Sequence, residues 1–324
     1  MKIFKMLVIV LLALTFSSPV WAYTLHDPIV IGNDFEFIPA NGVTGGSGTQ
    51  NDPYIISGWQ IINTADRGVA IYIHNVSKYF VIYNCFVWGS VDGIKLISIA
   101  ACRATILNVT AWLNDDGIHV EYVPNLEIDN ATVTYNSLNG IYVRYSDNMS
   151  ILGLTESRSI HGVKLFYSNN FDIEYSTFDN NSQTGLSSSY SAGSTVAYNT
   201  VSNNWNGVHL GYNDAVEVHH NYFTGNSGTG LTLGWLETGG SYAYMNSFID
   251  NGYYNAFDFG EEDSANYWSK DIPCLLGGMV SRGNYWDDMP CTFAFSNCLV
   301  YECVGDYTID GSEAKDYNPA KYEW

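Results

Sequence analysis

The sequence has few charged residues, and most of them are acidic. Asp, Glu, Lys and Arg make up 14% of the 324 residues, with 13 basic against 33 acidic side chains and a formal net charge of -20. Such a surface repels phosphate backbones, which argues against nucleic-acid binding. It also repels polyanionic sugars unless a divalent cation screens the contact. Low charge suits stacked β coils, because like charges repeated every 4.8 Å or so would repel each other.

The sequence also lacks a second apolar segment after its N-terminus, and no later segment has helical periodicity. Lys2 and Lys5 flank the start of the apolar run Met6–Phe16, and small residues lead to Ala22. This pattern is typical of a secretory signal peptide, with an uncleaved anchor as the alternative. We expect cleavage after residue 22, a secreted, periplasmic or cell-surface location, and no membrane span in the mature protein.

The chain does contain an internal repeat. A glycine followed by an aliphatic residue recurs at steps of 22 to 25 residues: Gly68, Gly93, Gly117, Gly140, Gly162, Gly185, Gly207 and Gly230. Leucine-rich repeats need more leucine, and propeller blades need about 40 residues or more. A coil of this length fits three short strands that pair in parallel with the next coil. The predicted fold is therefore all-β, a single-stranded right-handed parallel β-helix.

A column of asparagines runs in phase with the glycines: Asn84, Asn108, Asn130, Asn199, Asn221 and Asn246. Inward asparagines at a turn can each hydrogen-bond to the asparagine one coil away. Such a ladder would satisfy buried amides that otherwise cost about 1–3 kcal/mol each.

The ends of such a rod need caps, because they expose strand edges and apolar core. We expect an N-terminal cap over residues 23–57, coils over 58–262 and a C-terminal cap over 263–324. In an exported protein without a Cys-x-x-Cys pair, the cysteines are expected to form disulfides. Two bridges are predicted among the four cysteines of the C-terminal cap, with connectivity left open: Cys274, Cys291, Cys298 and Cys303. Cys85 and Cys102 are a further candidate pair.

Three segments resemble NosD-like β-helix proteins, often described as periplasmic copper-binding. Asn41–Trp59 resembles their opening segment, Gly283–Asp288 their terminating motif and Gly305–Ser312 their closing segment. The resemblance implies a pectin-lyase-like β-helix fold and an exported location. It implies copper only through the family name, and the wider repeat family includes polysaccharide lyases, epimerases and hydrolases.

The histidines do not predict a preformed copper site. His119 and His209 share a column but lie four coils apart, and adjacent His219 and His220 should point to opposite faces of a regular strand. No metal ligands and no cofactor are therefore assigned. Acidic residues near the C-terminus could bind calcium, although their spacing matches no EF-type loop: Asp306, Asp310, Glu313 and Asp316.

Alternation places the residues two and four after each repeat glycine on the outside. With the residues just before the glycines, they form a polar patch over three coils: Asp115, Asp116, His119, Glu121, Tyr142, Arg144, His161 and Lys164. The catalytic candidates are Asp116, His119, Arg144 and Lys164, because acid–base chemistry on a sugar needs a carboxylate beside basic groups. The carbohydrate-binding candidates are Glu121, Tyr142, Arg144, His161 and Lys164.

An aromatic column lies five residues after the glycines: Tyr122, Tyr145, Tyr167, Tyr190, Tyr212 and Trp235. The rings could stack on sugars, but the favoured interpretation is that this position turns inward at a corner and fills the core.

The leading functional hypothesis is a non-catalytic exported or cell-surface protein that contacts a polysaccharide or cell-envelope glycan. One alternative is a polysaccharide lyase, epimerase or hydrolase that uses the face from Asp116 to Lys164. Another is a periplasmic accessory role in copper delivery, which rests on the resemblance alone. The sequence leaves the oligomeric state open.

Overall fold

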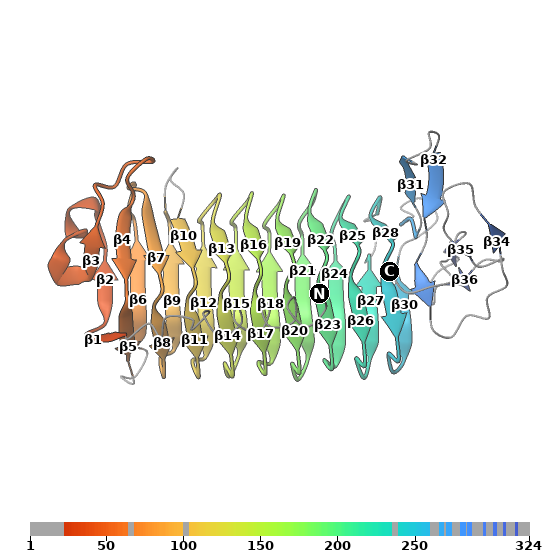
Figure 1. Ribbon diagram of the computed structural model, residues 1–324, viewed down its shortest axis with the longest axis horizontal. Coiled ribbons are helices and arrows are strands. Elements are labelled where there is room, and N and C mark those ends of the chain that lie inside the picture. Colours follow the sequence, from red (N-terminus) through yellow and green to blue (C-terminus); the bar gives the residue numbers. More distant parts are fainter. Residues whose placement is uncertain are drawn as a thin grey trace, which may run out of the picture.

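The protein is a long rod of stacked coils with three parallel sheets along its length (Figure 1). The computed structural model describes residues 23–63, 68–99, 104–234, 239–259, 266–268 and 284, and further on the backbone of short strands up to Asp316. The predicted right-handed parallel β-helix is confirmed. No helix among the described residues is both long and apolar enough to span a bilayer.

Each coil contributes one strand to each sheet. Sheet A contains β1 (Thr24–His26), β5 (Trp59–Ile62), β8 (Phe86–Trp88), β11 (Thr110–Trp112), β14 (Thr132–Thr134), β17 (Thr155–Ser157), β20 (Thr177–Asp179), β23 (Thr200–Ser202), β26 (Tyr222–Thr224), β29 (Ser247–Ile249) and β33 (Tyr285–Trp286). Sheet B contains β2 (Ile29–Ile31), β6 (Val69–His74), β9 (Asp92–Ile97), β12 (Asp116–Glu121), β15 (Asn139–Arg144), β18 (His161–Phe166), β21 (Thr184–Ser189), β24 (Asn206–Gly211), β27 (Thr229–Leu233) and β30 (Tyr254–Asp258). Sheet C contains β3 (Val43–Gly45), β4 (Tyr54–Ser57), β7 (Phe80–Tyr83), β10 (Ala104–Leu107), β13 (Glu127–Asp129), β16 (Ser150–Leu152), β19 (Asp172–Glu174), β22 (Thr195–Ala197), β25 (Glu217–His219) and β28 (Tyr242–Tyr244).

The parallel sheets extend into both segments that were predicted as caps. In the N-terminal one, β1, β2 and β4 pair in parallel with the following coil, whereas β3 pairs antiparallel with β4. In the C-terminal one, β33 continues sheet A beyond β29. The remaining elements are two 3-10 helices and three antiparallel pairs: η1 (Asp34–Glu36), η2 (Pro39–Asn41), β31 (Lys270–Pro273) with β32 (Met279–Arg282), β34 (Ala294–Phe295) with β35 (Tyr301–Glu302), and β36 (Tyr307–Thr308) with β37 (Lys315–Asp316).

The repeat glycines are explained by close contact between coils. A Cβ atom on Gly117 would lie 2.6 Å from the carbonyl oxygen of Gly140, and one on Gly140 would lie 2.6 Å from that of Gly162. The amide nitrogen of Asn136 would lie 2.9 Å from the same Gly117 Cβ. Any side chain at these positions would push two coils apart, so the 22- to 25-residue period is a steric requirement of the stack.

The predicted asparagine ladder is correct for only half of its members. Asn199, Asn221 and Asn246 are buried, and the backbone N–H of Asn199 donates to Asn221 Oδ1 over 3.0 Å. Asn108 and Asn130 are exposed instead, and with Asn84 they occupy a left-handed corner one residue earlier in the coil. Asparagine tolerates this left-handed conformation, so asparagines occur both at the corner position and at the buried position that follows it. The predicted column combined the two positions.

A second ladder, which was not predicted from the sequence, lines the corner between sheets A and B and is buried except at its partly buried last member: Asn114, Asn136, Asn181, Asn204, Asn226 and Asn251. Ser159 occupies the step between Asn136 and Asn181, and its N–H donates to Asn181 Oδ1 over 2.9 Å. The Nδ2 atom of Asn136 is buried with no hydrogen-bond partner among the described residues. The ladder is therefore interrupted at this step.

Glu156 fills the interruption from sheet A, where its counterparts in the adjacent coils are Val133 and Phe178. The side chain is fully buried; Ser159 Oγ donates to its Oε1 over 2.9 Å, and Asn181 Nδ2 donates to its Oε2 over 2.7 Å. Burial raises the pKa of Glu156 to about 8, against the lowering effect of both hydrogen bonds.

The predicted cysteine pairs mostly lie outside the described residues. This applies to all four cysteines of the C-terminal cap and to Cys102. Cys85 is buried with a free thiol that donates to the carbonyl oxygen of Tyr83 over 3.5 Å. The two bridges of the C-terminal cap therefore stay predictions, whereas the free thiol of Cys85 does not support a bond to Cys102.

Substituting one repeat glycine should destabilise the whole stack. Gly140→Ala puts a Cβ against backbone from the next coil and against buried Glu156, so we expect a loss of about 1–3 kcal/mol in unfolding free energy. Gly45→Ala is the control, because the nearest atom to its Cβ is 3.9 Å away. Urea unfolding of both variants measures the effect, and equal stabilities would refute the steric explanation.

Glu156 should make stability depend on pH. Its folded pKa of about 8 exceeds the usual glutamate value of 4.5, so the stability it contributes is complete below pH 4.5 and is lost as pH rises through 8. The slope should reach about 1.4 kcal/mol per pH unit. Glu156→Gln should remove this slope, whereas Glu174→Gln on sheet C should keep it. An unchanged slope in Glu156→Gln would contradict the assignment.

Candidate functional site

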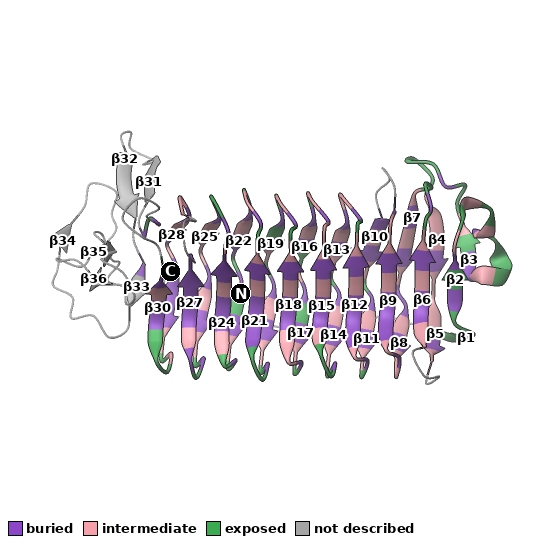
Figure 2. Cartoon of the chain, turned by 180° about the vertical axis from the view of Figure 1, so that it is seen from behind, coloured by how far each residue is buried: buried purple, intermediate pink, exposed green. Residues whose placement is uncertain are grey.

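The candidate site is the outer face of sheet B over β9, β12, β15 and β18. Along β12 the burial alternates as predicted, with Ile118 and Val120 inside and His119 and Glu121 outside. Figure 2 shows buried and partly buried stretches along the strands of the rod. Parallel pairing sets His119 beside Tyr142, and Tyr142 beside Lys164. The predicted patch therefore forms one continuous surface. Asp115 lies in the corner before β12, where it accepts a hydrogen bond from Ser137 Oγ.

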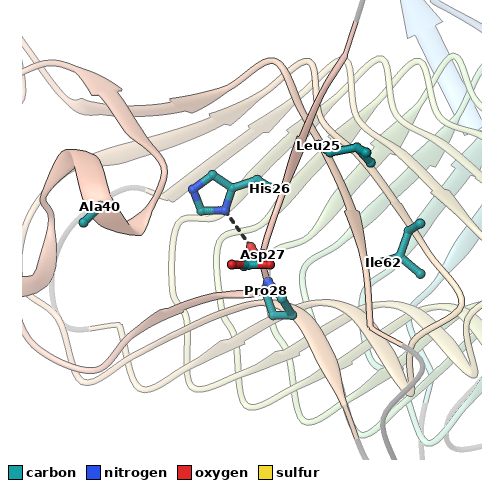
Figure 3. A pocket seen from close by; sticks show the side chains of 6 residues that line it. All are labelled: Leu25, His26, Asp27, Pro28, Ala40 and Ile62. Atoms are coloured by element: carbon teal, nitrogen blue, oxygen red, sulfur yellow. Dashed lines mark hydrogen bonds between the residues drawn. The ribbon is translucent and has the colours of Figure 1, made fainter.

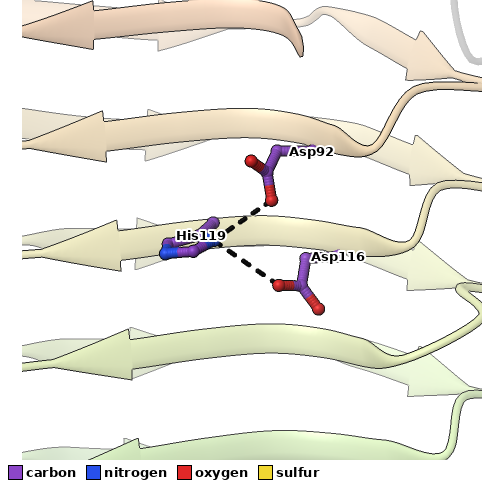
Figure 4. A group of neighbouring side chains, drawn as sticks. All are labelled: Asp92, Asp116 and His119. Atoms are coloured by element: carbon purple, nitrogen blue, oxygen red, sulfur yellow. Dashed lines mark hydrogen bonds and ion pairs between the residues drawn. The ribbon is translucent and has the colours of Figure 1, made fainter. Parts of the chain in front are cut away.

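His119 lies at the centre of a cluster of carboxylates (Figure 4). Its Nδ1 is 3.1 Å from Asp92 Oδ1 and 3.5 Å from Asp116 Oδ2, and its Nε2 is 3.1 Å from Glu121 Oε1. Lys95 Nζ pairs with Asp92 Oδ2 over 2.7 Å. The sequence analysis left Asp92 and Lys95 out of the patch, although both stand in the columns that supplied its other members.

The cluster holds His119 as a cation. Burial alone would lower its pKa, but hydrogen bonds from the imidazole to Asp116, Asp92 and Glu121 outweigh burial and raise the pKa to about 10. Burial would raise the pKa of Asp92, yet its hydrogen bonds with His119 and Lys95 hold it below the usual range. His119 therefore cannot act as a proton acceptor near neutral pH.

The other predicted residues lie on the two following strands. Arg144 places its guanidinium 4.6 Å from the ring centroid of Tyr145 and donates to that tyrosine's hydroxyl over 3.0 Å. Lys164 Nζ lies 5.5 Å from the ring centroid of Phe166. Burial, helped by the charge of Lys164, lowers the pKa of His161 to about 4, so this imidazole is neutral. Burial raises the pKa of Tyr142.

The tyrosine column is outside the core, so the favoured packing interpretation is wrong. Tyr122, Tyr145, Tyr167, Tyr190 and Tyr212 follow the sheet B strands with φ between 50° and 58°. This left-handed conformation reverses the alternation and turns each side chain outward. Neighbouring rings stack with centroids 4.7–5.2 Å apart and planes within 19°. Trp235 lies outside the described residues.

Two groups have ligand atoms close enough to share a metal ion. One oxygen each of Asp92 and Asp116 and one nitrogen of His119 lie within 4.8 Å of one another, but the proton on His119 and the ion pair with Lys95 compete with an ion there. His219 and His220 also converge, with their Nδ1 atoms 3.0 Å apart. The expectation that these two point to opposite faces is wrong, because His220 has a φ of 55°.

A hollow of about 530 Å³ lies at the N-terminal end of the rod, away from this face (Figure 3). It is lined by Leu25, His26, Asp27, Pro28, Ala40 and Ile62. The His26 ring contacts the carbonyl oxygen of Asp27 over 2.6 Å and packs on Trp59. The lining includes none of the predicted site residues.

Comparison with known proteins supports the fold. A family model described as right handed beta helix region matches residues 93–251. No curated protein sequence shows significant similarity to the chain. The A-module of mannuronan C-5 epimerase AlgE6 of Azotobacter vinelandii is similar in structure, with a TM-score of 0.59 and 18% identity over 66% of this chain and 62% of that one.

Two further solved structures share the architecture. The A-module of AlgE4 from the same organism gives a TM-score of 0.53 and 14% identity over 65% of this chain and 63% of its own. The enzymatically active domain of tailspike protein 2 of bacteriophage CBA120 gives a TM-score of 0.54 and 11% identity over 78% of this chain and 42% of its own. The chain thus spans less than two thirds of each of these structures, and at such identities the likeness shows the fold alone.

The charge on His119 should be visible in the pH dependence of stability. Its folded pKa of about 10 exceeds the usual histidine value of 6.5, so its contribution to stability is complete below pH 6.5 and is lost as pH rises through 10. Between pH 6.5 and 9, His119→Gln should therefore lose less stability than the wild type. His209→Gln is the control from the same column, because burial lowers the pKa of His209. Parallel unfolding curves for His119→Gln and wild type would contradict the assignment.

Proposed function

We propose that the chain is an exported or cell-surface β-helix protein that binds a polysaccharide on the outer face of sheet B without turning it over. One observation carries the proposal. Five Lys and Arg side chains lie among the residues whose side chains are described, and three of them, Lys95, Arg144 and Lys164, are on this face. Lys95 and His119 are balanced by Asp92, Asp116 and Glu121, so the uncompensated positive charge that could bind an acidic sugar lies at Arg144 and Lys164.

Arg144 and Lys164 are the cations available to a ligand. Both lie over aromatic rings, and neither is in ion-pair distance of a carboxylate among the described residues. They stand on adjacent strands, two residues out of register, which places them about 8 Å apart from strand geometry. Carboxylate or sulfate groups on neighbouring sugars fit that separation. The solved structures of similar fold include proteins named as mannuronan epimerases, which supports a glycan as the ligand.

The protonation states favour binding over turnover. A general base works best with a pKa near the operating pH. The pKa of His119 is raised to about 10 and that of His161 is lowered to about 4, so neither imidazole is tuned for proton transfer at neutral pH. The enzyme alternative, a lyase, epimerase or hydrolase, would have to use Asp116, Tyr142 or Lys164 on the same face.

The NosD-like resemblance would add copper delivery as a further role. Among the described histidines, the closest pair of imidazoles is His219 and His220, and no third imidazole joins them in a ligand cluster. Two nitrogens are fewer than a tight copper site uses. Glycan binding is therefore the function we adopt.

A glycan screen combined with a depolymerisation assay tests the proposal. The wild type should bind an acidic polysaccharide and release no products, while Arg144→Ala and Lys164→Ala each weaken binding several-fold. Arg158→Ala and Lys78→Ala are charge-matched controls away from this face, and both should bind normally. Depolymerisation or epimerisation that disappears in Lys164→Ala or Asp116→Ala would show an enzyme instead, and equal losses in all four variants would show a non-specific charge effect.

A further inference from the structure

The tyrosine ladder ends abruptly at Tyr122. The corner position of the preceding coil is Ser98, which has a φ of 53° and whose N–H donates to the carbonyl oxygen of Glu121 over 2.9 Å. The N–H of Tyr122 donates in the same way to the carbonyl oxygen of Arg144, the residue before Tyr145. Ser98 therefore occupies the next position of the same column. A serine covers little of an aromatic ring, and the ladder has no ring at this step.

The ring of Tyr122 consequently differs from the rings inside the ladder. Tyr145, Tyr167 and Tyr190 each have a stacked tyrosine on both sides, so they present only their edges and hydroxyls to solvent. Among the described residues, Tyr122 stacks on one side only, with Tyr145. It is 51% exposed, compared with 42% for Tyr167 and 44% for Tyr190. Its ring face toward Ser98 is the one open aromatic face of the ladder between Tyr122 and Tyr190.

A carboxylate that can accept hydrogen bonds from sugar hydroxyls adjoins this open face. Glu121 precedes Tyr122, and its Oε1 contacts His119 while its second oxygen has no hydrogen-bond partner among the described residues. Lys95 stands on the coil of Ser98 but three residues earlier, and its bond to Asp92 directs the ammonium group away from this face. The side chains of Glu121 and Lys95 are 28% and 23% exposed. An aromatic face beside a carboxylate can hold both the apolar face and a hydroxyl group of a sugar ring.

We propose that the open face of Tyr122 is a binding subsite for a pyranose ring, which stacks at the step where Ser98 interrupts the ladder. The sugar ring takes the place of the missing tyrosine and continues the stack by one step. This subsite rests on the proposed function and extends it, because it lies beside the sheet B face at the end of the cluster around His119. A glycan held by Arg144 and Lys164 would reach it across β12.

The proposal is tested by placing an aromatic ring at position 98, where the ladder has none. Ser98→Tyr should complete the ladder, keep or raise the thermal midpoint, and lower glycan affinity at least tenfold because the new ring takes the subsite. Tyr122→Asn should also lower affinity at least tenfold, since it removes the ring and asparagine tolerates the left-handed backbone. Tyr122→Phe keeps the ring face and should stay within about twofold of the wild type. Tyr135→Asn is the control, because Tyr135 is an exposed corner tyrosine with a φ of 60° that follows sheet A.

The probes are hexasaccharides of β-1,4-linked glucose, β-1,4-linked mannuronate and α-1,4-linked galacturonate, titrated into the full chain by calorimetry. Ring protons of the bound sugar should shift upfield in proton NMR spectra with the wild type and not with Ser98→Tyr. Binding that persists in both Ser98→Tyr and Tyr122→Asn but falls in Arg144→Ala would overturn the subsite and leave the proposed function standing. If the wild type binds none of the three probes, both proposals fail.

Discussion

The spacing between coils constrains every other feature of the molecule. In a parallel stack each residue lies about 4.8 Å from its counterpart in the next coil, so a side chain is accepted only if it tolerates a neighbour at that distance. Glycine does so by having no side chain, where carbonyl oxygens such as that of Gly140 leave no room. Asparagine does so by pairing its amide with the next amide, and tyrosine by stacking its ring. The composition of the chain follows from these three solutions.

Charged groups that lie close together in this arrangement are stabilised where neighbouring positions supply the opposite sign. On sheet B, His119 is surrounded by carboxylates from its own coil and from the coil before it, and Lys95 neutralises Asp92 in turn. Glu156 has no such partner and is accommodated as a protonated group in the core. The same constraint therefore produces a compensated cluster on the surface and a neutral carboxyl inside. The cations beyond the cluster are the ones left for a ligand.

Much of this could be predicted from sequence, and the side chains whose direction was predicted wrongly share one cause. The glycine period fixed the coil length, and alternation from each glycine placed His119, Tyr142 and Lys164 outside correctly. Alternation fails at a residue in the left-handed region, and no composition rule marks a tyrosine as left-handed. The exposure of Tyr122 and the convergence of His219 on His220 were therefore missed. The protonation states depend on distances between coils, which a linear sequence does not contain.

The interrupted ladder also bears on how long such a rod can be. Beyond the interruption, Asn181, Asn204 and Asn226 make the same bonds to the following coil. A whole coil could be duplicated or excised there in evolution, and each remaining amide would still meet an equivalent acceptor. Between Asn136 and Asn181, by contrast, Glu156 needs its own serine and its own asparagine, so that coil cannot be exchanged for its neighbours. Rod length is thus a variable trait on the C-terminal side of Glu156 and a fixed one at Glu156 itself.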